Sequence, residues 1–215
     1  MEIEVAIAGA HGKIGLLLGK LLVEQGHTVL GLIRNPEQEG DLHAIGVEPV
    51  ICDLEGDHDV AAAVSGVDAV VFAAGAGSGS GVARKRTMDF EGAVKLIEAA
   101  KAEGVRRYAI VSAMGAASPP AEGGDVFGEY LRAKADADAA LRASGLDYTV
   151  VRPGGLTDAP GTGLVSVGER LDRGEIPRAD VAALLAAVLV TPNTIGKSFD
   201  LVSGATPIAD AVASV

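Results

Sequence analysis

Short apolar runs alternate with longer amphipathic stretches along the whole chain. The apolar runs predict strands at 3–8, 28–33, 48–52, 68–73, 106–112, 147–151 and 198–202. The amphipathic stretches predict helices at 13–25, 84–103, 128–144 and 178–190, a poorer helix at 37–45 and a short one at 58–65. This alternation is typical of a parallel sheet with helices on both faces. We therefore expect an α/β fold of the doubly wound kind, arranged in three layers.

Glycines mark the ends of several predicted helices, where the chain needs a residue that tolerates a positive φ. They are Gly26, Gly46, Gly66, Gly104 and Gly145. Two further stretches, "GAGSGSG" at 75–81 and "SPPAEGG" at 118–124, are predicted loops that follow strand ends. Ligands of open α/β sheets bind beside such loops.

The length and the apolar runs limit the choice of architecture. A chain of 215 residues that is 48% hydrophobic buries a sizeable core, and we expect one domain, 1–215. Its longest apolar stretch, "VAALLAAVLV", is much shorter than the roughly 20 residues of a bilayer span. The N-terminus lacks the pattern of a secretory signal. We therefore expect a cytoplasmic protein with no membrane partner.

Charge and rare residues exclude other classes of function. The chain has 18 Lys and Arg against 29 Asp and Glu, which gives a net charge of −11 and disfavours a nucleic-acid partner. The lone Cys52 lies in an apolar stretch and is expected to be a buried thiol. Histidines at 27, 43 and 58 lack the spacing of a metal site, so we expect no metal. A small-molecule substrate is the expected partner.

A glycine-rich turn, "AGAHGKIG", joins the first predicted strand to the first helix. Glycines at three-residue intervals let the backbone approach a diphosphate, which the amino end of the helix also attracts. In this interpretation Gly9 forms the sharp turn, Gly12 leaves room for the phosphates and Gly15 lets the helix pack closely on the sheet. An ordinary tight turn is the alternative. The candidate phosphate-binding residues are Gly9, His11, Gly12, Lys13, Ile14 and Gly15.

The end of the second strand, "GLIRNPEQ", bears on the choice of dinucleotide. An acidic residue there binds the ribose hydroxyls of NAD, whereas an arginine accommodates the 2′-phosphate of NADP. Arg34, followed by Asn35, occupies this position, and its guanidinium suits a phosphate. NADP(H) is therefore preferred, with NAD(H) as the alternative.

The next two strand ends extend the same edge of the sheet. Asp53 and Leu54 follow the third strand, where a carboxylate can accept a hydrogen bond from an adenine amino group. Ala73, Ala74 and Gly75 follow the fourth strand and leave space for a cofactor. Together these positions predict one ligand-binding edge.

Candidate catalytic residues lie on the fifth strand and the helix that follows it. Tyr130 and Lys134 are four residues apart, so both project from one helix face. A phenol that gives up a proton at neutral pH needs a lowered pKa, to which a neighbouring ammonium contributes. Ser112, at the end of the fifth strand, is placed to hold a substrate carbonyl beside the phenol. A tyrosine and a lysine on a solvated helix face are the alternative.

The assembled motifs resemble the short-chain dehydrogenase/reductase superfamily over nearly the whole chain. "AGAHGKIG", "VVFAAGAGSG" and "SGLDYTVVRPGGL" resemble most closely its atypical branch of NmrA-like and biliverdin reductase B-like flavin reductase members. The resemblance implies a Rossmann-type sheet, an NAD(P) cofactor and catalytic Ser, Tyr and Lys residues. It also implies that Arg152, Pro153 and Gly154 end the sixth strand beside the nicotinamide. Asp89 stands where active members often have an Asn.

These expectations combine into one function and two alternatives. We expect an NAD(P)H-dependent oxidoreductase that reduces a small carbonyl, quinone or flavin, with Tyr130 as the proton donor and Lys134 holding the ribose. The substrate side is expected at 114–127, 154–177 and the C-terminal segment. The alternatives are a non-catalytic NAD(P)-binding redox sensor and, below it, an epimerase or dehydratase, since the chain lacks their larger C-terminal region. Either a monomer or a homodimer is expected.

A basic run opens the fourth predicted helix. Arg84, Lys85 and Arg86 are placed to meet an anionic substrate near the cofactor, although a solvated helix face is the alternative.

Overall fold

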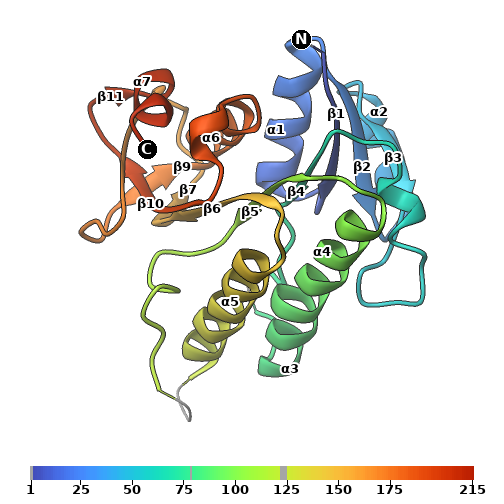
Figure 1. Ribbon diagram of the computed structural model, residues 1–215, viewed down its shortest axis with the longest axis horizontal. Coiled ribbons are helices and arrows are strands. Elements are labelled where there is room, and N and C mark those ends of the chain that lie inside the picture. Colours follow the sequence, from blue (N-terminus) through green and yellow to red (C-terminus); the bar gives the residue numbers. More distant parts are fainter. Residues whose placement is uncertain (1, 78, 122–124) are drawn as a thin grey trace.

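The computed structural model describes residues 2–77, 79–121 and 125–215 (Figure 1). Within these ranges, nine strands form one sheet in the order β11-β8-β10-β6-β5-β4-β1-β2-β3. The parallel strands are β1 (Glu4–Ala8), β2 (Thr28–Ile33), β3 (Glu48–Ile51), β4 (Ala69–Phe72), β5 (Arg107–Val111), β6 (Asp147–Pro153) and β10 (Lys197–Ser203). β8 (Leu164–Gly168) is antiparallel to both β10 and β11 (Thr206–Pro207). β7 (Gly155–Thr157) and β9 (Glu175–Pro177) pair separately.

Helices cover both faces of the sheet, which confirms the three-layer α/β fold (Figure 1). α1 (Lys13–Glu24) packs against α6 (Arg178–Leu189) on one face, and α6 also contacts α7 (Ile208–Ala213). The other face carries α4 (Ala93–Ala102) and α5 (Val126–Ala143), which lie side by side. Each face has its own cluster of buried apolar side chains. The short α2 (Glu39–His43) follows β2 along the chain.

The predicted strands are all present, and the five glycines expected after helices all have a positive φ. The predicted helix at 58–65 is wrong, because only a 3₁₀ turn at Ala62–Val64 forms there before Gly66 ends it. The helix expected at 84–103 begins at α3 (Val82–Arg84) and continues as a π-helical stretch, Lys85–Gly92, before α4. The helix expected at 128–144 starts two residues earlier, since the Asp125 carboxylate caps it by accepting from the Gly128 amide.

The strands β7, β8, β9 and β11 and the helix α7 have no counterpart among the predicted elements. They are short and contain or adjoin glycine and proline, so their periodicity is too weak to predict them. Most of them lie in the predicted substrate side, 154–177. Residue 78 of the predicted loop 75–81, and residues 122–124 of the predicted loop 118–124 and of the substrate-side range 114–127, lie outside the described residues.

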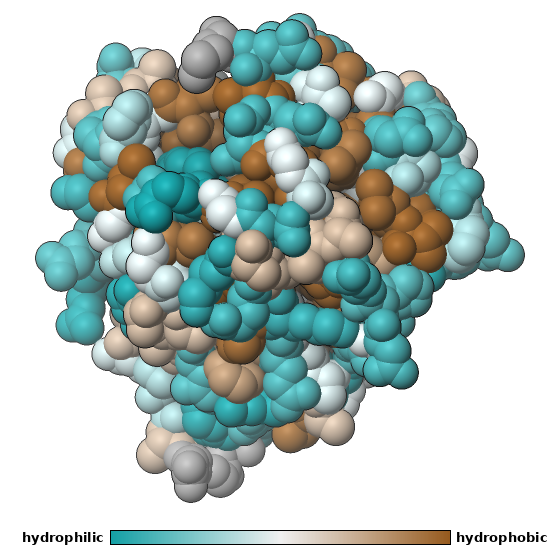
Figure 2. Space-filling model, turned by 45° about the vertical axis from the view of Figure 1, so that its right-hand side comes forward, coloured by the Kyte–Doolittle hydropathy of each residue, from teal (hydrophilic) through white to brown (hydrophobic). Residues whose placement is uncertain are grey.

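The molecular surface is mainly hydrophilic between separate apolar patches on the face shown in Figure 2. Within the part of the chain that the structure describes, a helix both long enough and apolar enough to span a membrane is not found.

The turn between β1 and α1 leaves no space for side chains at two of its glycines. Gly9 has a φ of +80°, and a Cβ there would lie 2.6 Å from the Ala74 Cα. A Cβ on Gly15 would lie 2.3 Å from the Gly9 carbonyl oxygen. The predicted sharp turn at Gly9 is confirmed, whereas Gly15 allows the helix to pack on the turn itself, and not on the sheet as expected.

This packing predicts that Gly15→Ala destabilises the protein. Overpacking of this kind lowers the free energy of unfolding by about 1 to 3 kcal/mol. The matched control is Gly40→Ala, because an added Cβ there meets nothing within 4 Å, and we expect its free energy of unfolding to stay unchanged or rise slightly. Urea unfolding measures both variants. Equal stability of the two would contradict the close contact.

Candidate functional site

Two clefts follow one another along the carboxyl edge of the sheet. The first cleft has a volume of about 340 Å³ and lies at the ends of β1, β2, β3 and β4. The second cleft has a volume of about 660 Å³ and lies at the ends of β5, β6 and β10. Because β1 pairs with both β2 and β4, the first cleft lies where the strand order reverses. Ligands of doubly wound sheets bind at this point.

The first cleft brings together most of the predicted cofactor-binding residues. The predicted residues that line it are Gly9, His11, Gly12, Arg34, Asp53, Leu54, Ala73, Ala74 and Gly75. The sequence analysis did not assign to the cofactor Ala8, Leu32, Ile33, Gln38, Cys52, Ala76, Gly77, Arg84 and Met88, which also line it. The apolar members of this second group belong to strand ends and to the buried core, so their pattern predicts packing alone.

The glycine turn presents the amino end of α1 to the first cleft. The Gly12 amide donates to the Gly9 carbonyl at 2.9 Å, and α1 begins at the next residue. Gly12 supplies no capping side chain, and the first turn of α1 carries no acidic residue. The first amides of a helix lack intrahelical acceptors and carry a partial positive charge, so an anion is favoured here. These features fit the diphosphate of a dinucleotide.

Five predicted cofactor-binding residues line neither cleft: Lys134, described below, and four residues that adjoin the first cleft in sequence. The exposed Lys13 ammonium forms an ion pair with Asp158, just after β7. Ile14 packs into the core, and Gly15 lies against the Gly9 carbonyl. The Asn35 side chain caps the 3₁₀ turn Pro36–Gln38 by accepting from the Glu37 amide at 3.1 Å. Local packing and capping thus place these side chains away from the cleft.

Two arginines of the first cleft converge on one carboxylate. Arg34 Nη1 lies 3.6 Å from Glu55 Oε2, and Arg84 Nη2 lies 3.1 Å from the same oxygen. The Thr87 hydroxyl donates to the other oxygen, Glu55 Oε1, at 2.6 Å. This arrangement places two guanidinium groups together near the end of β2, where a phosphate would compete with Glu55 for them.

The second cleft contains several of the predicted catalytic and nicotinamide-side residues. Those lining it are Ser112, Tyr130, Pro153 and Gly154. The Ser112 hydroxyl is buried and has no hydrogen-bond partner among the described residues. Further residues that line it were not singled out from the sequence as site residues, and they include Phe127, Leu131, Leu156, Arg170, Leu171, Arg173, Arg178 and Asp200.

The predicted lowering of the Tyr130 pKa is wrong. Burial of the phenol raises its pKa, and the opposing effect of the Lys134 ammonium is smaller. Lys134 Nζ lies 6.0 Å from the centre of the Tyr130 ring. The phenol is therefore protonated at neutral pH and keeps a proton that it can donate.

Lys134 occupies a different position from the one expected of a ribose-binding residue. Its side chain is buried, and Nζ lies 3.1 Å from Asp89 Oδ1 in the π-helical stretch. It also donates to the Val111 carbonyl at 3.1 Å and does not line either cleft. Asp89, which stands where the resemblance implies an Asn, provides the carboxylate that holds this ammonium inside the protein.

A second buried ion pair lies beside the first. Arg152 Nε donates to Asp138 Oδ2 at 3.0 Å, so the side chain expected beside the nicotinamide is directed to α5. Burial raises the pKa of Asp138, and the Arg152 guanidinium opposes this shift. Since Lys134 and Asp138 are four residues apart on α5, the two pairs anchor one face of this helix to the sheet and to the π-helical stretch.

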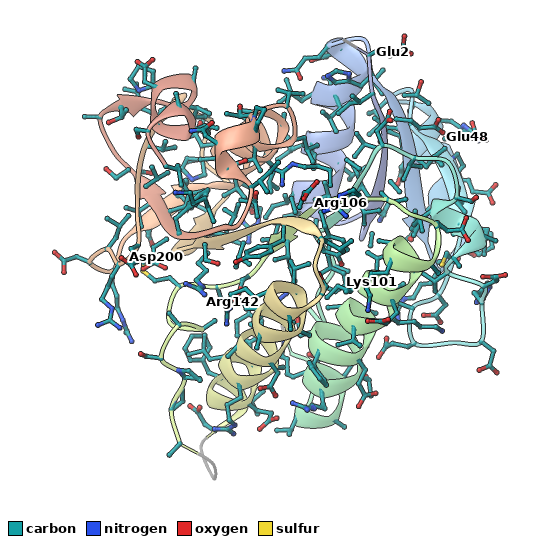
Figure 3. The ribbon with its side chains drawn as sticks, in the orientation of Figure 1. Glu2, Glu48, Lys101, Arg106, Arg142 and Asp200 are labelled. Carbon is teal, nitrogen blue, oxygen red and sulfur yellow. The ribbon has the colours of Figure 1, made fainter. Side chains whose placement is uncertain are left out.

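Asp200 is the most unexpected polar residue of the second cleft (Figure 3). It lies on β10 and is 5% exposed. Its Oδ2 accepts from the Leu171 amide at 3.1 Å, while Oδ1 has no hydrogen-bond partner in the described ranges. An acidic residue inside the apolar strand "SFDLV" is the signal that could have identified it from the sequence.

Comparisons with known proteins agree with this geometry. A family model described as NAD(P)H-binding matches residues 9–192. The Bacillus subtilis (strain 168) protein named "Uncharacterized sugar epimerase YhfK" is 42% identical over 211 residues, covering 97% of this chain and 98% of that protein. The structure called "Putative NAD-dependent epimerase/dehydratase from Bacillus halodurans" is 38% identical with a TM-score of 0.93, covering 99% of this chain and 100% of that one. The anaerobillin reductase ChuY from Escherichia coli O157:H7 is 26% identical with a TM-score of 0.80, covering 93% and 97%.

The buried pair of Lys134 and Asp89 predicts a large effect of removing one charge. Lys134→Met leaves the Asp89 carboxylate unpaired inside the protein, so the free energy of unfolding falls by about 3 to 5 kcal/mol. Lys101→Met is the control, because Lys101 pairs with Glu98 on the surface and its loss costs below about 1 kcal/mol. Adding Asp89→Leu to Lys134→Met restores most of the lost stability. Similar urea midpoints for the two single variants would refute this account of Lys134.

Proposed function

Because the chain belongs to the NAD(P)H-binding family, we propose that it is an NAD(P)H-dependent oxidoreductase that reduces a small carbonyl, quinone or flavin. The observation that supports this most is the succession of the two clefts along one sheet edge. The first contains a glycine turn suited to a diphosphate, and the second contains a protonated phenol and a buried hydroxyl. This is the arrangement that a reductase requires, with cofactor and acceptor side by side.

The residues of the first cleft would hold the nucleotide. The glycine turn and the amino end of α1 bind its diphosphate, while Asp53 and Leu54 lie on the adenine side. Pro153 and Gly154, at the end of β6, lie on the nicotinamide side. When bound, the reduced nicotinamide supplies a hydride to the acceptor.

Tyr130 would donate the proton that completes reduction of a carbonyl. Its phenol lines the second cleft, and its raised pKa keeps the proton in place over the neutral range. Ser112 lines the same cleft; its hydroxyl is buried beside the Asp138 carboxylate and would turn toward the substrate oxygen to donate to it. Lys134 acts on the phenol only through its charge, because it is held by Asp89.

Arg34 and Arg84 support NADP(H) as the preferred dinucleotide. Both guanidinium groups line the first cleft near the end of β2, where the 2′-phosphate of NADP would lie. Binding of this phosphate would replace their shared contact with Glu55. NAD(H) lacks the 2′-phosphate, so it cannot replace Glu55 as the partner of these two arginines.

Two alternatives remain as second candidates. The names of the Bacillus relatives, one "Uncharacterized" and one "Putative", favour an epimerase or dehydratase, and this chain covers nearly the whole length of both. In that case the protein would interconvert sugar epimers with no net consumption of NADH. A redox sensor would bind the dinucleotide and turn over no acceptor.

On sequence grounds we propose the cytoplasm as the location of this protein and a monomer or homodimer as its assembly.

The cofactor assignment predicts that Arg34→Glu discriminates between the two dinucleotides. Loss of a charge-assisted contact, with added repulsion, weakens NADPH binding at least about tenfold. NADH affinity stays within about twofold. Fluorescence of the reduced nicotinamide reports both affinities. The control Arg106→Glu makes the same change of charge at the amino end of β5, and it leaves the affinities for NADPH and NADH unchanged. Equal losses for NADPH and NADH in Arg34→Glu would refute the assignment.

The role of Tyr130 predicts that Tyr130→Phe slows aldehyde reduction by about 10²-fold or more. NADPH affinity stays unchanged in this variant. The control is Tyr148→Phe, at the opposite end of β6, and it keeps the wild-type rate.

The same role predicts a pH dependence. Because the phenol donates only while protonated, wild-type activity persists up to the raised pKa of Tyr130 and falls as the pH rises through it. Rates of NADPH oxidation across pH measure this. Full activity of Tyr130→Phe would show that another group supplies the proton.

A further inference from the structure

We propose that the second cleft selects organic anions, namely substrates with an apolar or aromatic body and at least one carboxylate or phosphate. Arg170, Arg173 and Arg178 would bind the anionic group. This inference rests on the proposed function, because it names the substrate class of the same site.

The charge of the second cleft is opposite to that of the chain as a whole. The chain has a net charge of −11, yet the described lining of this cleft contains three arginines and a single acidic residue, Asp200. Cationic clefts in an acidic protein concentrate anionic ligands near their walls. The guanidinium group also matches the geometry of carboxylates and phosphates.

Two of the three arginines have donors available for a ligand. Arg178 Nη1 already binds Asp158 Oδ1. Arg170 has only a long contact, 3.5 Å from Nη2 to the Ser118 hydroxyl. For Arg173, the described residues provide no ion pair or side-chain hydrogen bond. In the described residues, the neighbouring acids Glu169, Asp172 and Glu175 form no ion pair with Arg170 or Arg173, so an anion entering the cleft would meet guanidinium groups with free donors.

The loop that carries Arg170 and Arg173 is held in place by Asp200. The buried carboxylate accepts from the amide of Leu171, which together with Asp172 separates the two arginines on the 169–174 loop. At the end of this loop, the Gly174 carbonyl accepts from the Gly155 amide at 2.8 Å. Two fixed points reduce the entropy lost when the arginines bind a ligand. Asp200 is thus a positioning residue for the anion site.

Apolar side chains form the remaining wall of the cleft. Phe127 is 58% exposed and Leu156 is 38% exposed, which are high values for large apolar residues. The rings of Phe127 and Tyr130 have centroids 6.0 Å apart, so together they form an aromatic surface. Met114 and Leu131 also line the cleft. This wall suits a flat, apolar body, and the arginines suit its anionic substituent.

A pair of fluorescent probes tests this selectivity directly. 1-Anilinonaphthalene-8-sulfonate and N-phenyl-1-naphthylamine share one aromatic body and differ only in the sulfonate. Titrations use wild type, Arg170→Gln/Arg173→Gln and the control Arg142→Gln, each with and without NADP⁺. Arg142 is exposed in the last turn of α5 and is not among the residues that line the cleft. The three proteins should have equal urea midpoints, because all three replaced residues are exposed.

The expected result is that wild type binds the sulfonate at least about tenfold more tightly than the uncharged probe. The double variant loses this preference and retains its affinity for the uncharged probe, while Arg142→Gln behaves as wild type. Equal affinity for both probes in wild type, no binding of either, or a preference that survives in the double variant would each overturn the proposal.

NADPH oxidation with riboflavin and FMN, which differ by one phosphate, separates this proposal from the proposed function. Reduction of both flavins with equal kcat/KM would overturn the anion preference and leave the oxidoreductase function standing. A probe preference without reduction of any carbonyl, quinone or flavin would support the anion site and contradict the oxidoreductase function.

Discussion

The close approach of two backbone segments, the turn after β1 and the chain after β4, is the constraint on which the candidate site depends. A side chain at Gly9 would lie within 2.6 Å of the Ala74 Cα, and one at Gly15 would lie within 2.3 Å of the Gly9 carbonyl oxygen. With only hydrogen atoms at these positions, the amino end of α1 reaches the place where the strand order reverses. The first cleft and its capacity to bind an anion follow from this contact.

The second cleft depends on a different interaction, the two buried ion pairs along α5. Lys134 with Asp89 and Arg152 with Asp138 connect this helix to the π-helical stretch and to β6. Buried ion pairs add little net stability, because desolvation offsets much of their attraction. We interpret them as fixing the rotation of α5, so that Tyr130 faces the second cleft. The functional contribution of Lys134 is then indirect.

Much of the fold and of the first cleft could be predicted from the sequence. The alternation of apolar and amphipathic runs indicated the parallel strands, and residues at successive strand ends, such as Arg34 and Asp53, line the first cleft. These inferences succeeded because parallel strands place their carboxyl ends on one edge. The partner of Lys134 was missed because Asp89 lies 45 positions earlier, a pairing that helical spacing does not reveal. The 169–174 loop falls within the predicted substrate side, 154–177, but its two arginines were not singled out, because their placement depends on one buried carboxylate, Asp200, on a distant strand.

Isothermal titration calorimetry of the wild-type protein with NADPH, NADP⁺, NADH and NAD⁺ tests the central claim most directly, since the turn is held to bind the diphosphate that all four share. The account predicts binding of one nucleotide per chain, tighter for the phosphorylated pair. Absence of binding heat with all four nucleotides at several temperatures would contradict it.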